Sequence, residues 1–374
     1  MSITRKTLAI FTLGSFTSST GWALYYTLSR IDLKIELNAG YTGLMLLVAA
    51  ESLAGIASIL WGYLGDKLGG RRMVSIGILS IIPFALLGLL RKPRLFIMMA
   101  ALATILHSAS VPSVLAVLVS EEEKSGRRLG LFGGGSSAGW AFGSFLMAPI
   151  DGLGGPAAVY LLSAALIGLS LLIFSKWYPQ IDVTGESSSW EFVRKLPLLI
   201  LSISIIYFGL LWAFTVLSIK LYYELGGDKM LFAIFYGGLP ALIGSIIEPG
   251  AGVIADRVGG FKLLIFASAA YIVLMPLLYL SSGMLMAMLW LAPIYPFYYV
   301  SVGKTYSDLA PPDLKATSMG AANTAYSLGG LASGFTGILT DIYGIGYTVL
   351  LSVVVMVGGI SILLIGRPKK STYK

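Results

Sequence analysis

Long apolar runs separated by short polar segments make up nearly the whole chain. Each run has about 20 residues, the length that an α-helix needs to cross the hydrocarbon core of a bilayer. Helical periodicity adds little here, because helices surrounded by lipid and protein are apolar on all sides. The pattern predicts twelve membrane-spanning helices, at residues 7–29, 40–65, 73–90, 95–118, 130–150, 157–178, 197–219, 230–254, 263–281, 284–303, 317–340 and 346–366.

The least apolar internal stretch lies at residues 179–196, near the middle of the chain. It separates the twelve predicted spans into two sets of six. We therefore predict an N-terminal six-helix bundle at residues 1–178, a cytoplasmic linker at 179–196 and a C-terminal six-helix bundle at 197–374.

Two charged, glycine-rich loops indicate that the two halves are repeats. The sequence GYLGDKLGGRR begins at Gly62, and GVIADRVGGFK begins at Gly252, 190 residues later. The same offset holds far from the loops and needs no gap, which favours parallel repeats. The paired positions include Gly62 and Gly252, Asp66 and Asp256, Lys67 and Arg257, Gly69 and Gly259, Gly70 and Gly260, Arg72 and Lys262, Gly139 and Gly329, and Asp151 and Asp341.

Composition supports a membrane protein and accounts for the positive charge. Of the 374 residues, 56% are hydrophobic and 12% charged, and the mean hydropathy is +0.85; soluble domains carry about 25% charged residues. With both termini cytoplasmic, 19 of the 26 basic residues fall on the inner side. This asymmetry follows the positive-inside rule, although residues 91–94 break it. We expect a multi-pass plasma-membrane protein without a nucleic-acid partner.

Some chemistry is excluded by what the sequence lacks. Without cysteine there is no disulfide and no iron–sulfur cluster, and the single histidine excludes a multi-histidine metal site. The predicted loops are too short to hold an enzyme's clustered nucleophiles or metal ligands. We expect no cofactor, no metal and no enzymatic activity. The first apolar run is too long for a signal peptide, so we assign it as the first span.

The loop at Gly62 resembles the hallmark loop between the second and third spans of the major facilitator superfamily (MFS), and the loop at Gly252 resembles its weaker second copy. Gly70 departs from the pattern, because a basic residue is common there. The resemblance covers the whole chain. It implies an all-α membrane protein with twelve transmembrane helices in two six-helix pseudo-symmetric bundles, the MFS fold, and a secondary transporter that works by alternating access.

The resemblance also implies a role for the two loops. Span two lies beside span eleven in this superfamily, and span eight beside span five. Asp66 would dock at the positive end of span eleven, near Thr317 and Ser318, and so help to close the cytoplasmic side. Topology anchoring alone is the simpler alternative. The gate motif comprises Gly62, Asp66, Lys67, Gly69, Arg71, Arg72, Asp256, Arg257, Gly259 and Lys262.

Three ionisable residues, Glu51, Glu248 and His107, lie well inside predicted spans. Charges at that depth are costly and commonly functional. We expect neither carboxylate to have a cationic partner, because no Lys or Arg lies at comparable depth. Such a carboxylate is readily protonated, so all three residues are proton-coupling candidates. The structural alternative is a protonated glutamate hydrogen-bonded to a serine or a carbonyl between helices.

By the same resemblance, spans one, four, seven and ten line a central cavity. Span ten carries Pro293 and Pro296, which we expect to interrupt its helix. A cavity of aromatics and hydroxyls without buried Arg or Lys disfavours multiply charged anions and favours neutral, lipophilic or cationic solutes. The substrate-cavity candidates are Thr17, Ser18, His107, Tyr207, Tyr295, Tyr298 and Asn323.

The leading functional hypothesis is a monomeric, proton-coupled exporter of lipophilic or cationic small molecules. Alternatives are a proton-coupled importer of a neutral solute such as a sugar, a uniporter, a non-transporting membrane sensor and a membrane enzyme. Asp151 and Asp341, at the outer ends of spans five and eleven, are interpreted as structural, as outer counterparts of the cytoplasmic loops. Small residues of spans two, five and eleven, including Gly55, Gly139 and Gly334, favour close helix packing.

Overall fold

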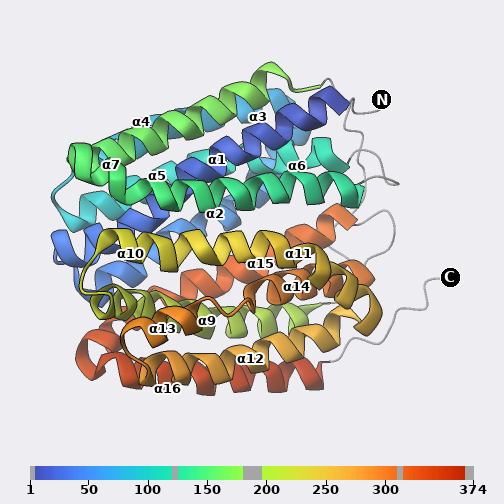
Figure 1. Cartoon of the computed structure of the whole chain (residues 1–374). Helices are drawn as coiled ribbons and strands as arrows, with labels where there is room; N and C mark the ends of the chain where they lie inside the picture. The colour runs from blue at the N-terminus through green and yellow to red at the C-terminus, as the bar shows by residue number, and fades with distance from the viewer. Residues whose placement is uncertain (1–4, 120–124, 180–195, 310–314, 367–374) are drawn as a thin grey trace.

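The computed structural model describes residues 5–119, 125–179, 196–309 and 315–366, and these segments are almost entirely helical. Most of the predicted linker, residues 180–195, lies outside them. In Figure 1 the elements of the first half occupy the upper part of the molecule and those of the second half the lower part, with their helices roughly parallel to one another. The predicted domain boundaries are compatible with this arrangement and stay predictions.

The first half contains seven α-helices and three short helical segments within the described residues. They are α1 (Arg5–Ile31), the π-helix η1 (Asp32–Glu36), α2 (Gly40–Leu68), α3 (Gly70–Gly77), the 3₁₀ turn η2 (Ile78–Ser80), α4 (Ile81–Leu86), the 3₁₀ turn η3 (Leu87–Leu89), α5 (Pro93–Ser108), α6 (Val111–Val119) and α7 (Ser125–Lys176).

The second half follows the same order of long helices. Its described elements are α9 (Pro197–Glu224), α10 (Lys229–Ala233), the π-helix η5 (Ile234–Gly238), α11 (Leu239–Val258), α12 (Gly260–Leu280), α13 (Gly283–Trp290), α14 (Tyr295–Leu309), α15 (Lys315–Ser333) and α16 (Thr336–Ile365).

Two of these helices contain a reversal of the chain. The α7 backbone leaves helical geometry at Gly155, where φ is +68°, and α16 does so at Gly344, where φ is +82°. Glycine tolerates these angles because it has no Cβ. The reversal in α7 joins predicted spans five and six, and the reversal in α16 joins the end of span eleven to span twelve.

Predicted spans four, ten and eleven are not continuous helices. Span four breaks at Ala109–Ser110 between α5 and α6, and span ten breaks at residues 291–294 between α13 and α14. Pro112 and Pro293 account for the first two breaks, because proline lacks an amide donor and restricts the residue before it. Span eleven breaks at Gly334–Phe335 between α15 and α16. The break in span ten was predicted; those in spans four and eleven were not.

The two glycine-rich loops have the same backbone geometry. Gly69 ends α2 with φ at +89°, and Gly259 ends α11 with φ at +91°. Each donates its amide to the carbonyl four residues earlier, over 2.9 Å in both cases. The residue that follows each of them, Gly70 or Gly260, begins the next helix. The predicted repeat is therefore confirmed at the level of the backbone in these loops.

The helices run between two opposite ends of the molecule, the loop face and the latch face. The loop face is the end that carries Gly69 and Gly259, and the latch face is the end that carries Asp151 and Asp341. The start of α1 and the end of α16 both lie at the loop face, on the right of Figure 1. By the positive-inside count, the loop face is the one expected to be cytoplasmic.

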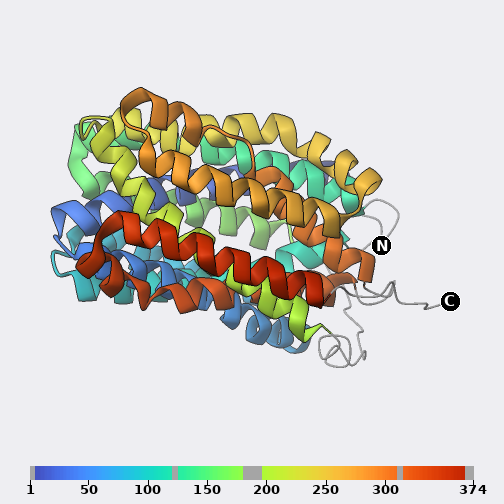
Figure 2. The same ribbon diagram turned by 90° about the horizontal axis from the view of Figure 1, so that it is seen from below.

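The halves meet along two seams, α2 against α15 and α16, and α7 against α10, η5 and α11. Figure 2 shows the red α16 running beside the blue helices of the first half. The contacts of span two with span eleven, and of span eight with span five, are confirmed.

Small residues let the first seam close tightly. A Cβ added at Gly55 would meet Ser327 of α15, and one added at Gly330 would meet Ser52 of α2. Gly337, nearer the latch face, lies against Thr42 in the same way. Within the first half, Gly139 packs on the backbone of Phe16. The predicted small-residue faces are thus packing surfaces.

Candidate substrate and coupling site

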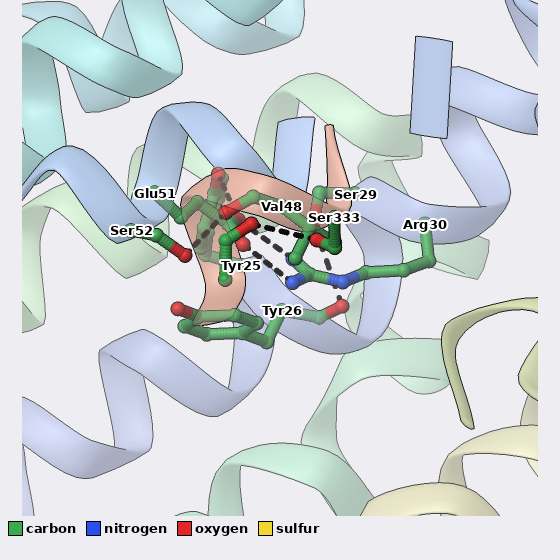
Figure 3. Close-up of polar contacts among 9 residues, drawn as sticks. Tyr25, Tyr26, Ser29, Arg30, Val48, Glu51, Ser52 and Ser333 are labelled. Atoms are coloured by element: carbon green, nitrogen blue, oxygen red, sulfur yellow. Dashed lines mark hydrogen bonds and ion pairs between the residues drawn. The ribbon is translucent and has the colours of Figure 1, made fainter. Parts of the chain in front are cut away.

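A buried ion pair between α1 and α2 lies beside the seam with the second half (Figure 3). Arg30 donates to Glu51 through both terminal nitrogens, with Nη1–Oε1 at 2.7 Å and Nη2–Oε2 at 2.5 Å. The Tyr25 hydroxyl donates to Oε1 of Glu51 at 2.7 Å. The guanidinium stacks over the ring of Tyr26, 4.2 Å from its centroid. Glu51 is 8% exposed, so the pair is removed from water.

The ion pair also contacts the second half. The Arg30 guanidinium approaches the hydroxyl of Tyr236 in η5. Ser333 of α15 lies next to the pair in Figure 3, and Ser52, one residue after Glu51, touches Gly330. Any movement of the halves against each other therefore changes the surroundings of Arg30.

The expectation that Glu51 lacks a cationic partner is wrong. Arg30 belongs to the last turn of α1, and its long side chain brings the guanidinium to Glu51, in the first half of α2. The premise of no buried arginine is wrong for the same reason. The pair as a whole is neutral, so it supplies no free positive charge for an anionic substrate.

Glu248 has a different partner. It lies in α11, and its carboxyl approaches the hydroxyl of Ser137 in α7, across the seam between the halves. Within the described part of the chain, no cationic side chain pairs with it. The structural alternative foreseen from the sequence, a glutamate bonded to a serine between helices, describes this contact; here the two helices belong to different halves.

His107 occupies the last turn of α5, immediately before the break in span four. Its Nε2 accepts a hydrogen bond from Nε1 of Trp22 at 3.1 Å, and its ring stands edge-on to the indole. Among the described residues, Nδ1 has no hydrogen-bond partner. His107 lines a pocket of about 150 Å³ in the first half, together with Ser15, Ser18 and Ser110.

Aromatic side chains from both halves gather near the middle of the molecule. In the first half, Tyr26 packs on Trp22 and Trp140, with ring centroids 5.4 Å apart in both pairs. A second pocket of about 170 Å³ lies at the break in span ten, where Tyr236 and Tyr295 are among its aromatic lining residues.

The second half contributes its own aromatic group. Tyr207 and Tyr299 bring their hydroxyls to 3.4 Å, and the ring of Tyr326 lies 4.7 Å from Tyr207 and 5.3 Å from Tyr299. Tyr207 therefore sits among polar aromatic neighbours, as a cavity-lining residue would.

The other substrate candidates are more scattered. Ser18 lines the His107 pocket, whereas the Thr17 hydroxyl bonds to the Leu13 carbonyl of its own helix. Tyr298 is 1% exposed and belongs to the core of the second half. Asn323 is exposed on α15, one turn from Ser327. The structure thus brings Ser18 and His107 together and places Thr17 and Tyr298 in helix packing.

Polar contacts close the latch face. The carboxylate of Asp341 accepts hydrogen bonds from the amides of Tyr41 and Thr42 at the start of α2, both at 2.8 Å, and from the Thr42 hydroxyl at 2.6 Å. Its repeat partner Asp151 accepts from Lys229 at the start of α10, at 2.8 Å. Each contact joins one half to the other, and the two are related by the repeat.

The gate motif at the loop face is described in part. The Asp66 and Lys67 side chains and Gly62 lie outside the described side chains, as do Thr317 and Ser318, so the Asp66 docking stays a prediction. Asp256 is paired within its own half, with Lys304 of α14 at 2.9 Å. The remaining basic motif residues, Arg71, Arg72, Arg257 and Lys262, are exposed.

The departure at Gly70 has a local cause. A Cβ at this position would fall on the hydroxyl of Tyr178, which itself donates to the Ser113 carbonyl at 3.1 Å. At the repeat position, a Cβ on Gly260 would lie 2.6 Å from the amide nitrogen of Thr305. A side chain would therefore displace the tip of Tyr178 in the first half and press on the α14 backbone in the second, and a basic residue would not fit without rearrangement.

Sequence reasoning missed Arg30, Ser137 and Trp22 as partners of the ionisable groups. Arg30 was placed outside the membrane because it lies near the predicted end of span one, although Arg side chains reach far from their Cα. Ser137 and Trp22 give no signal of their own in the sequence. Pro112 is the signal that could have revealed the break beside His107.

The described residues form two repeated bundles of helices with ionisable groups at their junction. A family model described as "Major Facilitator Superfamily" matches residues 11–334. The chain therefore belongs to the major facilitator superfamily, with the twelve-helix fold of that family, and is a transporter of small molecules rather than an enzyme.

Solved structures agree with the fold. A mutant of the nucleoside transporter NupG superposes with a TM-score of 0.79 at 12% identity, over 97% of this chain and 100% of that one. A bacterial homologue of the human lysosomal transporter Spinster, in an inward-facing and unoccupied conformation, superposes with a TM-score of 0.75 at 12% sequence identity, over 96% of each chain. A POT family transporter in complex with 5-aminolevulinic acid superposes with a TM-score of 0.76 at 12% sequence identity, over 96% of each chain. No curated protein matches the chain by sequence.

Proposed function

We propose that this transporter is proton-coupled, that it exports lipophilic or cationic small molecules across the plasma membrane, and that both of its termini are cytoplasmic. The observation that carries the proposal is the close approach of Glu248 to Ser137 across the seam between the halves. It links a titratable group to the surface along which the halves must separate.

A hydroxyl suits both protonation states of a coupling carboxyl. Ser137 can donate to a carboxylate and can accept from a carboxylic acid. Without a cation beside it, a carboxyl in a low-dielectric seam favours its neutral form, and it ionises more easily when the halves part and water enters. Proton binding at Glu248 is thereby linked to the contact between α11 and α7.

Glu51, unlike Glu248, is paired with a cationic side chain. It makes a bidentate bond with Arg30, and removing either partner would leave a buried charge without its counter-charge. Glu51 therefore serves as a fixed link between α1 and α2, and the approach of Arg30 to Tyr236 brings that link to the second half.

The proposed substrate class follows from the aromatic groups. Tyr26, Trp140 and Tyr207 present flat, polarisable faces, which bind lipophilic rings and, through their π-systems, cations. Glu248 adds a carboxyl for a cationic substrate. Import of a neutral solute is the second candidate function, and the uncharged lining of the His107 pocket favours it.

Transport in proteoliposomes tests the coupling. Protein is reconstituted with an imposed pH gradient, and movement of ethidium, a lipophilic cation, and chloramphenicol, a neutral amphiphile, is followed. We expect gradient-driven movement of at least one probe, and its loss in Glu248→Gln. Glu224→Gln is the matched control, because Glu224 lies within the second half and bonds to Gly283 and Lys220.

Two results would contradict the proposal. One is that neither probe moves in response to the pH gradient. The other is that Glu248→Gln keeps gradient-driven transport at the level of Glu224→Gln.

A further inference from the structure

The pocket at the break in span ten is walled by aromatic rings from several elements of the second half. This ring pocket is formed by Phe214 of α9, Tyr236 of η5, Tyr271 of α12, Trp290 of α13 and Tyr295 of α14, together with aliphatic residues and prolines. Among the described residues, no charged side chain belongs to its lining. Phe214, Tyr236 and Tyr295 are only half-buried, so part of their surface stays accessible to a ligand.

The rings meet at steep angles and so form walls rather than a stack. The Phe214 ring stands at 84° to Tyr271 and at 62° to Trp290, with centroids 5.3 and 5.2 Å apart. The indole nitrogen of Trp290 donates to the Tyr236 carbonyl at 3.4 Å, which ties α13 to η5. These contacts hold the rings in place without a ligand. An enclosure of aromatic rings attracts a cation, because the faces of the rings are negative.

The break in span ten adds the negative end of a helix to the same pocket. The helix α13 ends at Trp290, and the residues that connect it to α14, Leu291, Ala292 and Pro293, also line the pocket. The C-terminal end of a helix carries a partial negative charge. Ends of interrupted helices and unwound segments bind cations in transporters. The break therefore favours a positive group beside Trp290.

A carboxyl lies next to the ring pocket. The hydroxyl of Tyr295 packs against α11 at Gly244, where an added Cβ would fall on the hydroxyl oxygen. Glu248 follows Gly244 by four residues and projects from the same face of α11. It is close enough to Tyr295 to act on that hydroxyl electrostatically. The carboxyl is thus placed to stabilise a cation in the pocket.

The guanidinium of Arg30 does not cancel this preference. It approaches the hydroxyl of Tyr236, but both of its terminal nitrogens donate to the carboxylate of Glu51. The ion pair is neutral as a whole. The rings, the end of α13 and the Glu248 carboxyl all favour a positive group.

We propose that the ring pocket is a substrate subsite for a quaternary or bulky alkylated ammonium group, enclosed by the aromatic rings beside the C-terminal end of α13. A cavity of about 150 Å³ holds benzene, and a trimethylammonium group is of similar size, so it fits the pocket of about 170 Å³. The subsite rests on the proposed transport function and narrows its cationic substrates. A primary ammonium is strongly hydrated, so it loses more on leaving water and binds less well.

Three small alcohols provide the probes. Choline carries a trimethylammonium head, 3,3-dimethylbutan-1-ol carries a neutral head of the same shape, and protonated ethanolamine carries a primary ammonium. The purified protein is labelled with 5-fluorotryptophan and placed in nanodiscs. Each of its seven tryptophans then gives a ¹⁹F resonance, and Trp290→Phe identifies the one that belongs to the ring pocket.

We expect choline to shift the Trp290 resonance and to bind about tenfold more tightly than either of the other probes. Tyr295→Leu, which removes one ring of the enclosure, should weaken choline binding about tenfold. Tyr295→Phe keeps the ring and should keep the binding. Tyr343→Leu is the matched control, because Tyr343 is 58% exposed, pairs with Tyr347 and lies outside the pocket.

Four results would overturn the subsite. They are a Trp290 resonance that choline does not move, a neutral alcohol or a primary ammonium that binds as tightly as choline, a Tyr295→Leu variant that binds choline as Tyr343→Leu does, and a Tyr295→Phe variant that loses as much as Tyr295→Leu. The measurement needs no pH gradient, so it stays readable if the Glu248 coupling fails. The transport test includes the neutral probe chloramphenicol, so it stays readable if the subsite fails.

Discussion

At the scale of single residues, the ion pair of Arg30 and Glu51 dominates the energetics of the junction. Both side chains are buried, and both carboxylate oxygens accept from the guanidinium. Such a pair adds little net stability over an apolar pair of the same shape, but removing one partner is expensive because the other charge stays buried.

We expect Glu51→Gln to lower the free energy of unfolding by about 3–5 kcal/mol, since Arg30 would lose its counter-charge. The double variant Arg30→Met/Glu51→Met should recover most of that loss. Thermal unfolding of the purified variants in one detergent measures both. A single variant as stable as the native protein would show that the pair is solvated and contributes nothing.

The sequence revealed which ionisable residues matter but not how they pair. Glu51, Glu248 and His107 stand out because charge and polarity are rare in apolar spans. Their partners depend on how far a side chain reaches and on which helix faces which, and neither is encoded in the local pattern. Arg30 shows this best: its Cα lies in the last turn of α1 while its charge lies against the middle of the seam.

At the scale of elements, glycine placement explains how the repeated loops pack. Gly70 begins α3 against the tip of the Tyr178 side chain, whereas Gly260 begins α12 against the backbone of Lys304 and Thr305. A side-chain tip can move aside more easily than a helix backbone. The two positions are equivalent in the repeat, but they differ in how well they tolerate an added side chain.

We expect Gly260→Ala to destabilise the protein by about 1–3 kcal/mol through overpacking, and Gly70→Ala to cost less. Gly358→Ala in α16 is the control, because a Cβ there meets no neighbouring atom and alanine favours a helix. Thermal unfolding ranks the three. The packing explanation fails if Gly70→Ala is the most damaging.

The elements themselves were mostly predictable, and of their three interruptions only the one in span ten was. Twelve apolar runs and the offset of 190 residues gave the helices and the repeat, because bilayer thickness fixes span length. The breaks at Ala109–Ser110 and Gly334–Phe335 fall inside predicted spans. Hydropathy alone does not locate them, because a window of about 19 residues averages over a short interruption.

At the scale of the whole molecule, the repeat places one carboxylate latch in each half. Asp341 binds the backbone amides at the start of α2, and Asp151 binds Lys229 at the start of α10. A carboxylate at a helix start is favoured by the helix dipole and by the free amides. Both contacts must break before the halves can separate at the latch face.

We expect Asp341→Asn to favour opening of the latch face. A cysteine introduced at Ala49, which packs on Gly334 in the seam, should react with a membrane-impermeant maleimide about tenfold faster in this variant, because losing such a cap costs about 1 kcal/mol or more. The chain has no native cysteine, so the maleimide reacts with no other cysteine. Asp308→Asn, at the loop face, is the control, and equal rates in the two variants would exclude the latch role.

The most direct test of the account is the distance across the loop face as a function of pH, because Glu248 lies nearer to Gly259 than to Lys229 along its span. Spin labels on cysteines at Leu68 and Val258, which are 43% and 48% exposed and belong to different halves, report that distance without any substrate. Because a neutral Glu248 favours the seam contact, the native sequence should show the short distance at low pH and a growing long-distance population as pH rises. Glu248→Gln, which mimics the protonated form, should keep the short distance at every pH. A Glu248→Gln variant with the native pH response would contradict the account.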